Sequence, residues 1–536
     1  MKTILPRTVP PKILLTIAGA FLFNFLFWQE KMAINFLIFD LFIIGSVLSI
    51  YTDAAERNSV RWILAAHLLS VGMVIIYNTL LSKLAAIITI ILFAAFAEYL
   101  HRSVIYAAGS MFYQASFLLP EIKRLIIQIT TKSKDPRKLL RKLRLLLFPL
   151  GLLFIFFLVY IGGNRAFASI TGHVFQAIEN YLGCIFVYVS WPRLFFLLFG
   201  AYITGSLLIR SRSANFSEKE LSLSDRLIRT RPSRNSGPEL SIFNEVVSGL
   251  MGSFSKGMLA LKNKNLIGLI SLVLLNGLLL IINVTDFLYI WLGDDYGKDV
   301  PMAELLHEGT GVLIFSIVLA IIVVLFFFKG NLNFYKGNSK LKLMAYVWLI
   351  QNALLVASVC LRDYYYIANY GLAYKRVGVL FFLAIVLAGL GSVFIKIYHK
   401  KSNYFLFRFN GNVLLIMLVI GSLQNWDVFI AKYNIARMDK IQPDLQFLMN
   451  LSDQTLPVLR ENIDVLAEKS KDPQFSYFSG YRTTVDLKEI LAAREKNFLS
   501  EHQKLSWLSW NFADDDVYRS ITKSQVSQRS TSSVAQ

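Results

Sequence analysis

The sequence predicts an all-α, polytopic transmembrane helical bundle with a small helical domain outside the membrane at its C-terminal end. Of its 536 residues, 55% are hydrophobic and 17% are charged, whereas soluble proteins carry about a quarter charged residues. Apolar runs of roughly twenty residues recur, which is the length that a helix needs to cross a bilayer core of about 30 Å. After residue 424 the composition changes to 14 Lys/Arg and 15 Asp/Glu over 425–536, which indicates a segment outside the membrane.

Eleven apolar runs are predicted to span the membrane as helices, because a helix satisfies its own backbone hydrogen bonds where lipid offers no partner. The further run 103–120 is predicted to be re-entrant or interfacial, since a twelfth span would reverse the sidedness of one part of the chain. The predicted spans are residues 12–28, 32–51, 62–81, 84–101, 145–163, 193–209, 266–290, 309–328, 343–361, 377–397 and 405–424.

Two basic loops set the predicted orientation. Residues 121–144 hold nine Lys/Arg against two acids, and residues 210–264 hold ten against five. Loops of this kind lie in the cytoplasm, which places the N-terminus inside and, after eleven spans, the C-terminal domain outside. The acidic loop 291–308 then also lies outside. Reporter fusions at positions 230 and 440 are expected to report opposite sides.

The same patterns divide the chain into five parts. Residues 1–210 form a first membrane half of six spans, which includes the first basic loop. Residues 211–262, rich in Ser and Arg, form a flexible cytoplasmic linker. Residues 263–424 form the second membrane half, residues 425–520 the outward-facing helical domain, and residues 521–536 a disordered tail.

Motifs of soluble enzymes are absent from the sequence. No Walker A sequence, no G-x-G-x-x-G after a strand, no H-E-x-x-H and no G-x-S-x-G occurs. The six histidines and two cysteines have no ligand spacing, so neither a metal site nor a cofactor nor a disulfide is expected. The net charge of +20 lies mainly in loops beside apolar runs, which indicates the lipid bilayer rather than nucleic acid as the partner.

The basic segment 121–144 contains a cluster of cations just before the fifth span. A helix that begins at Asp135 and Pro136 carries these cations towards the membrane. Anionic lipid attracts each of them by about 1 kcal/mol; in the alternative interpretation they only set the topology. The cluster comprises Arg137, Lys138, Arg141, Lys142 and Arg144.

Three ionisable residues lie at or near membrane depth. Asp40 is near the middle of the second span, where a charged carboxylate costs roughly 3 kcal/mol unless it is paired, hydrated or protonated. Asp286 lies close to the outer end of the seventh span, where we expect it to be half hydrated, and His67 lies in the third span. Each is a functional candidate, and the structural alternative for each is a hydrogen bond between packed helices or a place at the hydrated membrane surface.

The stretch RDYYYIANYGLAYKRVG, residues 362–378, joins the ninth and tenth spans. Guanidinium groups beside tyrosine rings can bind a phosphate, a carboxylate or a sugar. The alternative is an aromatic belt with a snorkelling cation. The candidate element comprises Arg362, Asp363, Tyr366, Tyr370, Gly371 and Arg376.

Gly371 predicts a turn or a close approach of helices within this stretch, because glycine is poorly placed in a continuous helix. We expect Tyr370 and Arg376 to point into the protein. Arg376 should then bond tyrosine hydroxyls, backbone carbonyls or an acid such as Asp286 or Asp363, since a guanidinium facing lipid is costly.

Three stretches resemble a known family. YIANYGLAYKRVGVLFF, residues 366–382, resembles the Tyr-Gly-Leu-x-x-x-Arg signature of a bacterial family of polytopic inner-membrane proteins catalogued as a domain of unknown function. AKYNIAR, residues 431–437, with residues 444–459, and LSWLSWNF, residues 505–512, resemble the family's segments after the last span. The resemblance covers roughly 260–515 and departs at Ala373, where the family often has a small polar residue. It implies a bacterial inner-membrane location and no assigned activity.

Three classes of function stay open. The favoured class is a non-enzymatic envelope scaffold or sensor that acts through residues 425–520 and a protein partner, because catalytic motifs are absent and a helical domain is predicted outside the membrane. A secondary transporter or lipid translocator would use the intramembrane carboxylates. A membrane-embedded transferase acting on a lipid-linked substrate has the least support, because only GDDYGKD, residues 293–299, faintly resembles a paired acidic motif.

Overall fold

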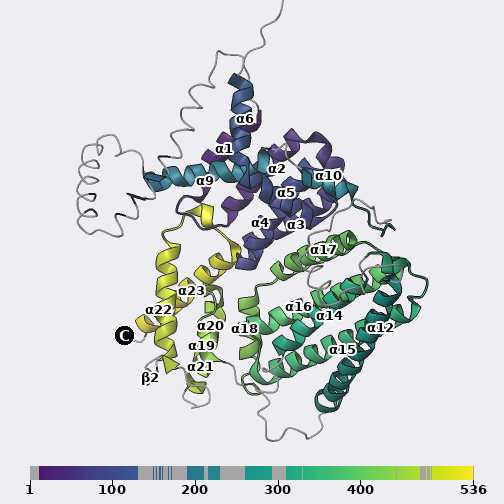
Figure 1. Ribbon diagram of the computed structural model, residues 1–536. Coiled ribbons are helices and arrows are strands. Elements are labelled where there is room, and N and C mark those ends of the chain that lie inside the picture. The colour runs from purple at the N-terminus through teal and green to yellow at the C-terminus, as the bar shows by residue number, and fades with distance from the viewer. Residues whose placement is uncertain are drawn as a thin grey trace, which may run out of the picture.

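A computed structural model describes residues 11–130, 190–209, 215–229, 260–292, 310–328, 330–441, 444–470, 478–479, 483–484 and 486–534, with isolated positions between 149 and 171. The described chain is helical except for a short antiparallel pair, β1 (Phe478–Ser479) and β2 (Thr483–Thr484). Figure 1 shows a helix block from the N-terminal part, a second block from the later apolar helices, and the C-terminal helices beside both. The all-α prediction is confirmed.

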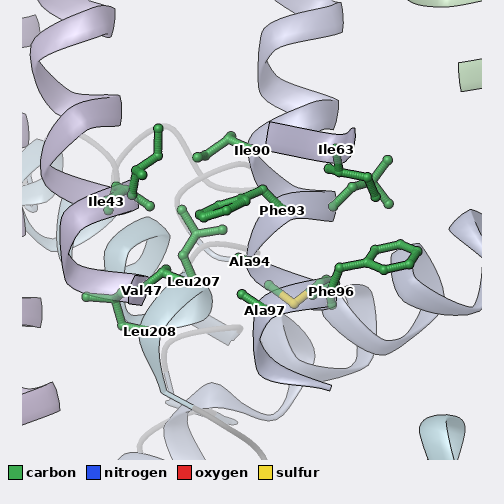
Figure 2. Close-up of a cluster of buried hydrophobic side chains, with 14 of the residues drawn as sticks. Ile43, Val47, Ile63, Ile90, Phe93, Ala94, Phe96, Ala97, Leu207 and Leu208 are labelled. Carbon is green, nitrogen blue, oxygen red and sulfur yellow. The ribbon is translucent and has the colours of Figure 1, made fainter. Parts of the chain in front are cut away.

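The first membrane block packs around α4, which is hidden between its neighbours. Ile43, Ile63, Phe93 and Leu208 belong to its apolar core (Figure 2). Five of the twelve buried residues of α4 are alanine, and small side chains let helices pack closely. The helices are α1 (Pro11–Phe27), α2 (Ile34–Ile50), α3 (Asn58–Ile76), α4 (Leu80–Glu98) and α9 (Trp191–Leu208).

The run 103–120 forms α5 (Val104–Ser116) and leads into α6 (Leu118–Thr130). The 13 residues of α5 extend over about 20 Å, less than the roughly 30 Å of a bilayer core. Gln114 on α5 donates hydrogen bonds to Glu98 and to the Ser206 carbonyl, both at 2.9 Å. The helix is thus tied to the ends of α4 and α9.

The second membrane block contains five apolar helices. Its core is formed by side chains such as Leu272, Ile317, Leu355 and Val393. Amide side chains also bridge its helices, and Gln351 donates to Asn276 at 3.2 Å. The helices are α12 (Ala260–Asp286), α14 (Thr310–Phe327), α15 (Ser339–Tyr370), α16 (Tyr374–His399) and α17 (Asn403–Ser422).

The C-terminal helices do not form their core alone. Leu448, Leu459 and Leu491 pack with Ile367, in the last turn of α15, and with Leu372, in the connection between α15 and α16. The helices are α18 (Trp426–Ile435), α19 (Leu445–Met449), α20 (Leu456–Glu461), α21 (Ile463–Lys469), α22 (Leu487–His502) and α23 (Phe512–Val534).

Seven described helices are long and apolar enough to cross a membrane, and three shorter apolar helices, α1, α2 and α14, accompany them. These ten coincide with ten of the predicted spans. The eleventh, 145–163, lies largely outside the described residues. The number of eleven spans therefore stays a prediction.

The helix ends define two faces of the molecule. On one, here called the C-terminal face, Gln454 donates to the Tyr77 carbonyl at 2.8 Å and Lys31 N–H donates to Ser509 at 2.8 Å. On the opposite face, here called the linker face, Ser402 N–H donates to the Asp225 carbonyl at 2.9 Å. The helix α16 runs from one face to the other.

Residues 215–229 are the described part of the predicted flexible linker. They form α10 (Asn215–Ser222) and an extended segment in which Arg226 pairs with Lys401. This segment connects the two membrane blocks at the linker face. The remainder of 211–262, up to the start of α12, lies outside the described residues.

Candidate functional site

Two of the predicted ionisable candidates, Asp40 and His67, meet inside the first membrane block. Asp40 lies mid-way along α2 with 1% of its surface exposed, and His67 lies on α3 with 0% exposed. His67 Nε2 is 3.4 Å from Asp40 Oδ2. Neither carboxylate oxygen accepts a hydrogen bond from a residue that the structure describes. A buried carboxylate with free lone pairs is uncommon, because desolvation of such a group is expensive.

The neighbours of His67 assign its ring nitrogens. The hydroxyl of Thr89, on α4, donates to the Ala85 carbonyl at 2.7 Å. Its oxygen therefore accepts from His67 Nδ1, 2.9 Å away. That leaves Nε2 facing Asp40, and two acceptors would repel each other there unless one of them carries a proton. A proton on either His67 Nε2 or Asp40 Oδ2 would remove that repulsion and make the pair neutral as a unit.

Asp40 lies on the wall of a cavity of about 970 Å³ between α1, α2, α4, α5 and α9. The lining is almost wholly apolar. Its acidic members are Asp40 and Glu30, and no Lys or Arg is among the described lining residues. Such a cavity suits a ligand with a hydrocarbon body and a group that donates hydrogen bonds or carries positive charge. Typical lining residues are Phe23, Phe36, Phe39, Ile90, Met111 and Phe199.

The C-terminal part of the chain contacts the rim of this cavity. Glu30 accepts hydrogen bonds from the Ser509 hydroxyl at 2.5 Å and from Ser506 N–H at 3.3 Å. Ile34 N–H donates to the Trp510 carbonyl at 3.2 Å. These contacts come from the Leu505–Phe512 stretch on which part of the family resemblance rests.

The Tyr-Gly-Leu element lies at the C-terminal face, between α15 and α16. Asn434 on α18 accepts from Leu372 N–H at 2.6 Å and donates to the Leu372 carbonyl at 2.9 Å. Gly371 has φ +77°, in the region that favours glycine. A Cβ on Gly371 would lie 2.4 Å from Asn434 Oδ1. Glycine thus permits both the turn and the close approach of the amide.

Arg376 points into this element. Its guanidinium donates to the Tyr370 carbonyl at 2.8 Å and to the Gly371 carbonyl, and it stacks over the Tyr366 ring at 4.2 Å from the centroid. The sequence predicted tyrosine hydroxyls, backbone carbonyls or an acid as hydrogen-bond partners of Arg376, and the hydrogen bonds described here go to backbone carbonyls. They belong to the end of α15, where a cation is favoured by the helix dipole.

Arg362 and Asp286 form a separate ion pair, at 2.5 Å, between α15 and the end of α12. Asp286 was expected to be half hydrated, but 4% of its surface is exposed. The pairing supplies the reason, because the guanidinium replaces the lost water. Asp363 is also buried, and its Oδ2 accepts no hydrogen bond from the described part of the chain.

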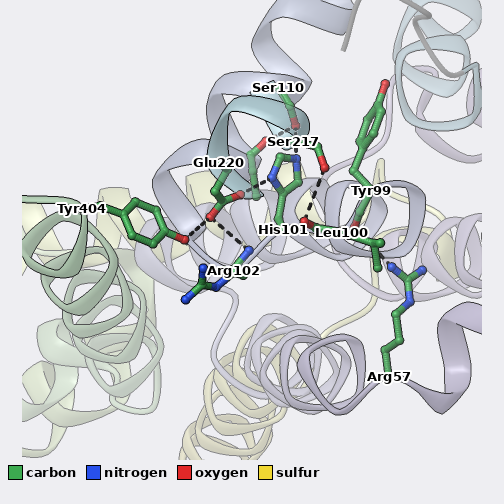
Figure 3. Close-up of polar contacts among 10 residues, drawn as sticks. Arg57, Tyr99, Leu100, His101, Arg102, Ser110, Ser217, Glu220 and Tyr404 are labelled. Atoms are coloured by element: carbon green, nitrogen blue, oxygen red, sulfur yellow. Dashed lines mark hydrogen bonds and ion pairs between the residues drawn. The ribbon is translucent and has the colours of Figure 1, made fainter. Parts of the chain in front are cut away.

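A buried cluster that the sequence did not reveal joins the two blocks at the linker face (Figure 3). Glu220, on α10, contacts His101 Nδ1 at 2.6 Å and accepts from the Tyr404 hydroxyl at 2.7 Å. His101 Nε2 is 2.9 Å from Ser110 Oγ, and Arg102 N–H donates to Glu220 at 3.0 Å. Burial alone would raise the pKa of Glu220, but these hydrogen bonds lower it below the ordinary value. The only signal in the sequence was an acid within the linker.

Apart from Asp363, the predicted site residues within the described chain thus form three separate groups: the Asp40–His67 pair, the Arg362–Asp286 pair, and the Arg376–Gly371 element. No cluster of three or more metal-ligating side chains occurs among the described residues. The stretch 293–299 lies outside them, as do the cations predicted to contact anionic lipid, Arg137, Lys138, Arg141, Lys142 and Arg144.

A comparison with family models matches residues 63–462 to a family described as "Domain of unknown function (DUF4153)". This range includes the second membrane block and, from the first, most of α3 with α4 and α9, but not α1 or α2. The resemblance seen in the sequence began near residue 260. The matched range ends before the Leu505–Phe512 stretch. No curated protein and no solved structure matches the chain.

Proposed function

Because this chain belongs to the DUF4153 family, whose description names no activity, we propose its function from its geometry: a membrane carrier that exchanges a cationic amphiphile for a proton at Asp40. The observation that carries the proposal is the Asp40–His67 pair on the wall of the apolar cavity. The proposal selects the transporter class from the three that the sequence left open.

The exchange follows from charge balance in a region of low polarity. The pair is neutral while it holds its shared proton. A ligand with an ammonium group can pair with the Asp40 carboxylate only after that proton leaves, because two positive charges beside one carboxylate are unfavourable in a buried site. Binding of one cation should therefore release one proton. The hydrocarbon part of the ligand is held by the apolar lining.

The lining charge favours cations over anions. Asp40 and Glu30 are the acidic lining residues, and an anionic headgroup would meet both without a described Lys or Arg to compensate. Like charges in a low-dielectric cavity repel strongly. Alkylammonium ions should thus bind, and alkyl sulfates of equal length should not.

A sensor is the second candidate, and the contact between Glu30 and Ser509 favours it. A ligand in the cavity would change the contacts between the cavity rim and the C-terminal part of the chain. The core shared with Ile367 and Leu372 ties the same helices to the second block. This packing supports a scaffold or sensor role in which 425–520 acts together with the membrane helices.

Binding of decyltrimethylammonium to the purified protein in nanodiscs tests the proposal. This quaternary ion carries no exchangeable proton, so any proton released on binding comes from the protein. We expect saturable binding with about one proton released per ion, followed with a pH dye, and no binding of decyl sulfate. Asp40→Asn should abolish both signals. The matched control Ser46→Ala, on the same helix and outside the cavity lining, should leave them unchanged.

Flux measurements separate the two candidates. In proteoliposomes with an imposed pH gradient, a carrier should accumulate the labelled cation in exchange for protons, and Asp40→Asn should not. Binding without flux, together with altered protease sensitivity of the C-terminal helices, would favour the sensor. Equal binding of both amphiphiles by the native protein and by Asp40→Asn would refute the site itself.

A further inference from the structure

A second apolar groove, of about 800 Å³, lies on the seam between the two membrane blocks. Its walls come from α4 of the first block and from α16 and α17 of the second. Leu81, Phe381, Ile385 and Leu418 are among its lining residues. It shares no lining residue with the cavity at Asp40. Binding in this groove is therefore independent of the proposed carrier activity.

The groove has one polar end, at the C-terminal face. The Asp427 carboxylate there accepts from the Tyr374 hydroxyl at 2.6 Å and from Ser452 N–H at 3.2 Å. Asn78 is 9% exposed and lines the groove, and its Oδ1 has no hydrogen-bond partner among the described residues. A buried carbonyl oxygen without a donor costs about 1–3 kcal/mol. The lining of the groove therefore includes both an unused acceptor and a carboxylate.

The dimensions match one lipid chain. From Tyr374, at the polar end, to Ile385 is eleven residues of α16, which rise by about 16 Å. The polar end lies at the start of α4 and α16 and at the end of α17, where helices reach the membrane surface. Polar groups at the surface and apolar walls at depth follow the polarity of a lipid leaflet.

We propose that this groove binds a phospholipid of the leaflet at the C-terminal face, with an amine headgroup at Asp427 and Asn78 and an acyl chain along Leu81 and Phe381. The ammonium donates to the free lone pairs of both side chains, and the described lining contains no Lys or Arg to repel it. The bound chain fills the seam between the blocks. The lipid is thus a structural and specific ligand.

Native mass spectrometry of the protein from nanodiscs of equimolar phosphatidylethanolamine and phosphatidylglycerol tests the inference. We expect about one retained lipid per chain, enriched several-fold in the amine. Gly378 lines the groove, and no atom lies within 4 Å of a Cβ built there. Gly378→Leu should therefore fill the groove and remove the retained lipid. Gly391→Leu on the same helix, equally open but outside the groove, is the matched control and should keep it.

The variant Asp427→Asn distinguishes recognition of the headgroup from binding of the acyl chain. This test remains valid even if Gly378→Leu folds poorly. It should retain a lipid but lose most of the amine preference. Retention of the same lipid with the same preference in Asp427→Asn would overturn the inference. Equal loss of the retained lipid in Gly378→Leu and Gly391→Leu would also overturn the inference, since such a result would indicate general destabilisation. An unchanged proton release at Asp40 in these variants would show that the two sites are separate.

Discussion

The side-chain amide of Asn434 holds both backbone groups of Leu372, accepting from its N–H at 2.6 Å and donating to its carbonyl at 2.9 Å. A single amide thus replaces the backbone partners that the chain loses where α15 ends. It also fastens the C-terminal helices to the second membrane block. Two sequence stretches that resemble one family are therefore one structural unit.

Asn434→Ala should destabilise this unit. The change leaves the Leu372 N–H and carbonyl buried without their partner. Each orphaned group lowers the free energy of unfolding by about 1–3 kcal/mol. We expect a clearly lower melting temperature in detergent. Asn369→Ala is the control, since Asn369 is exposed and donates to the Tyr365 carbonyl of its own helix. An equal fall in melting temperature there would contradict the assignment.

Gly371→Ala should also lower the melting temperature. The added Cβ meets Asn434 Oδ1 at 2.4 Å, and φ of +77° is unfavourable for alanine. Backbone strain of this kind costs about 1–3 kcal/mol. The comparison is Gly378→Ala, where the Cβ has open space. If both variants melt alike, the turn does not depend on glycine.

Arg376→Ala should reduce the level of protein in the membrane and its thermal stability. It removes the donors to the Tyr370 and Gly371 carbonyls and the stacking on Tyr366. The loss should not exceed the roughly 3–5 kcal/mol found when one partner of a buried pair is removed. Lys375→Ala, at the exposed neighbouring position, should have little effect. Unchanged stability with lost activity in Arg376→Ala would instead indicate a ligand site.

The Arg362–Asp286 pair should show strong coupling in a double-mutant cycle. Either Arg362→Met or Asp286→Leu alone leaves an unpaired buried charge, which lowers the free energy of unfolding by about 3–5 kcal/mol. The double variant should recover much of that loss, because two apolar side chains pack against each other. Denaturation of the four proteins in mixed micelles measures the coupling. Additive losses would show that the pair contributes little.

Glu220 should make stability depend on pH. Its pKa in the folded protein lies below the ordinary value, because hydrogen bonds from His101 and Tyr404 outweigh the effect of burial. The stabilisation is therefore present above the pKa of the unfolded chain, about 4.3, and is lost as the pH falls through the lower folded pKa. Glu220→Gln should melt lower than the native protein at pH 7, and the difference should shrink below about pH 4.

The exposed residue Glu218 on the same helix provides the matched control for this prediction. Glu218→Gln should follow the native protein at every pH. The difference in melting temperature between the native protein and Glu220→Gln could instead stay constant from pH 7 to the acid limit. That result would mean that the carboxylate charge is not what joins the two blocks.

The sequence by itself determined the all-α class and the positions of ten apolar helices, because lipid permits few backbone arrangements and the required length is set by the bilayer. It also singled out Gly371 and Arg376, since a glycine and a cation between two apolar runs both need a local explanation. These inferences depend on chain order and spacing, which a sequence contains.

Only the tertiary structure decided which polar groups meet. Asp40 and His67 are paired because α2 and α3 pack together, and Ser509 reaches Glu30 across 479 positions of sequence. Glu220 contacts Tyr404 across 184 positions, from within a stretch predicted as a flexible linker. Burial and pairing depend on how helices pack in three dimensions, and helix periodicity alone does not select one neighbour among many apolar faces.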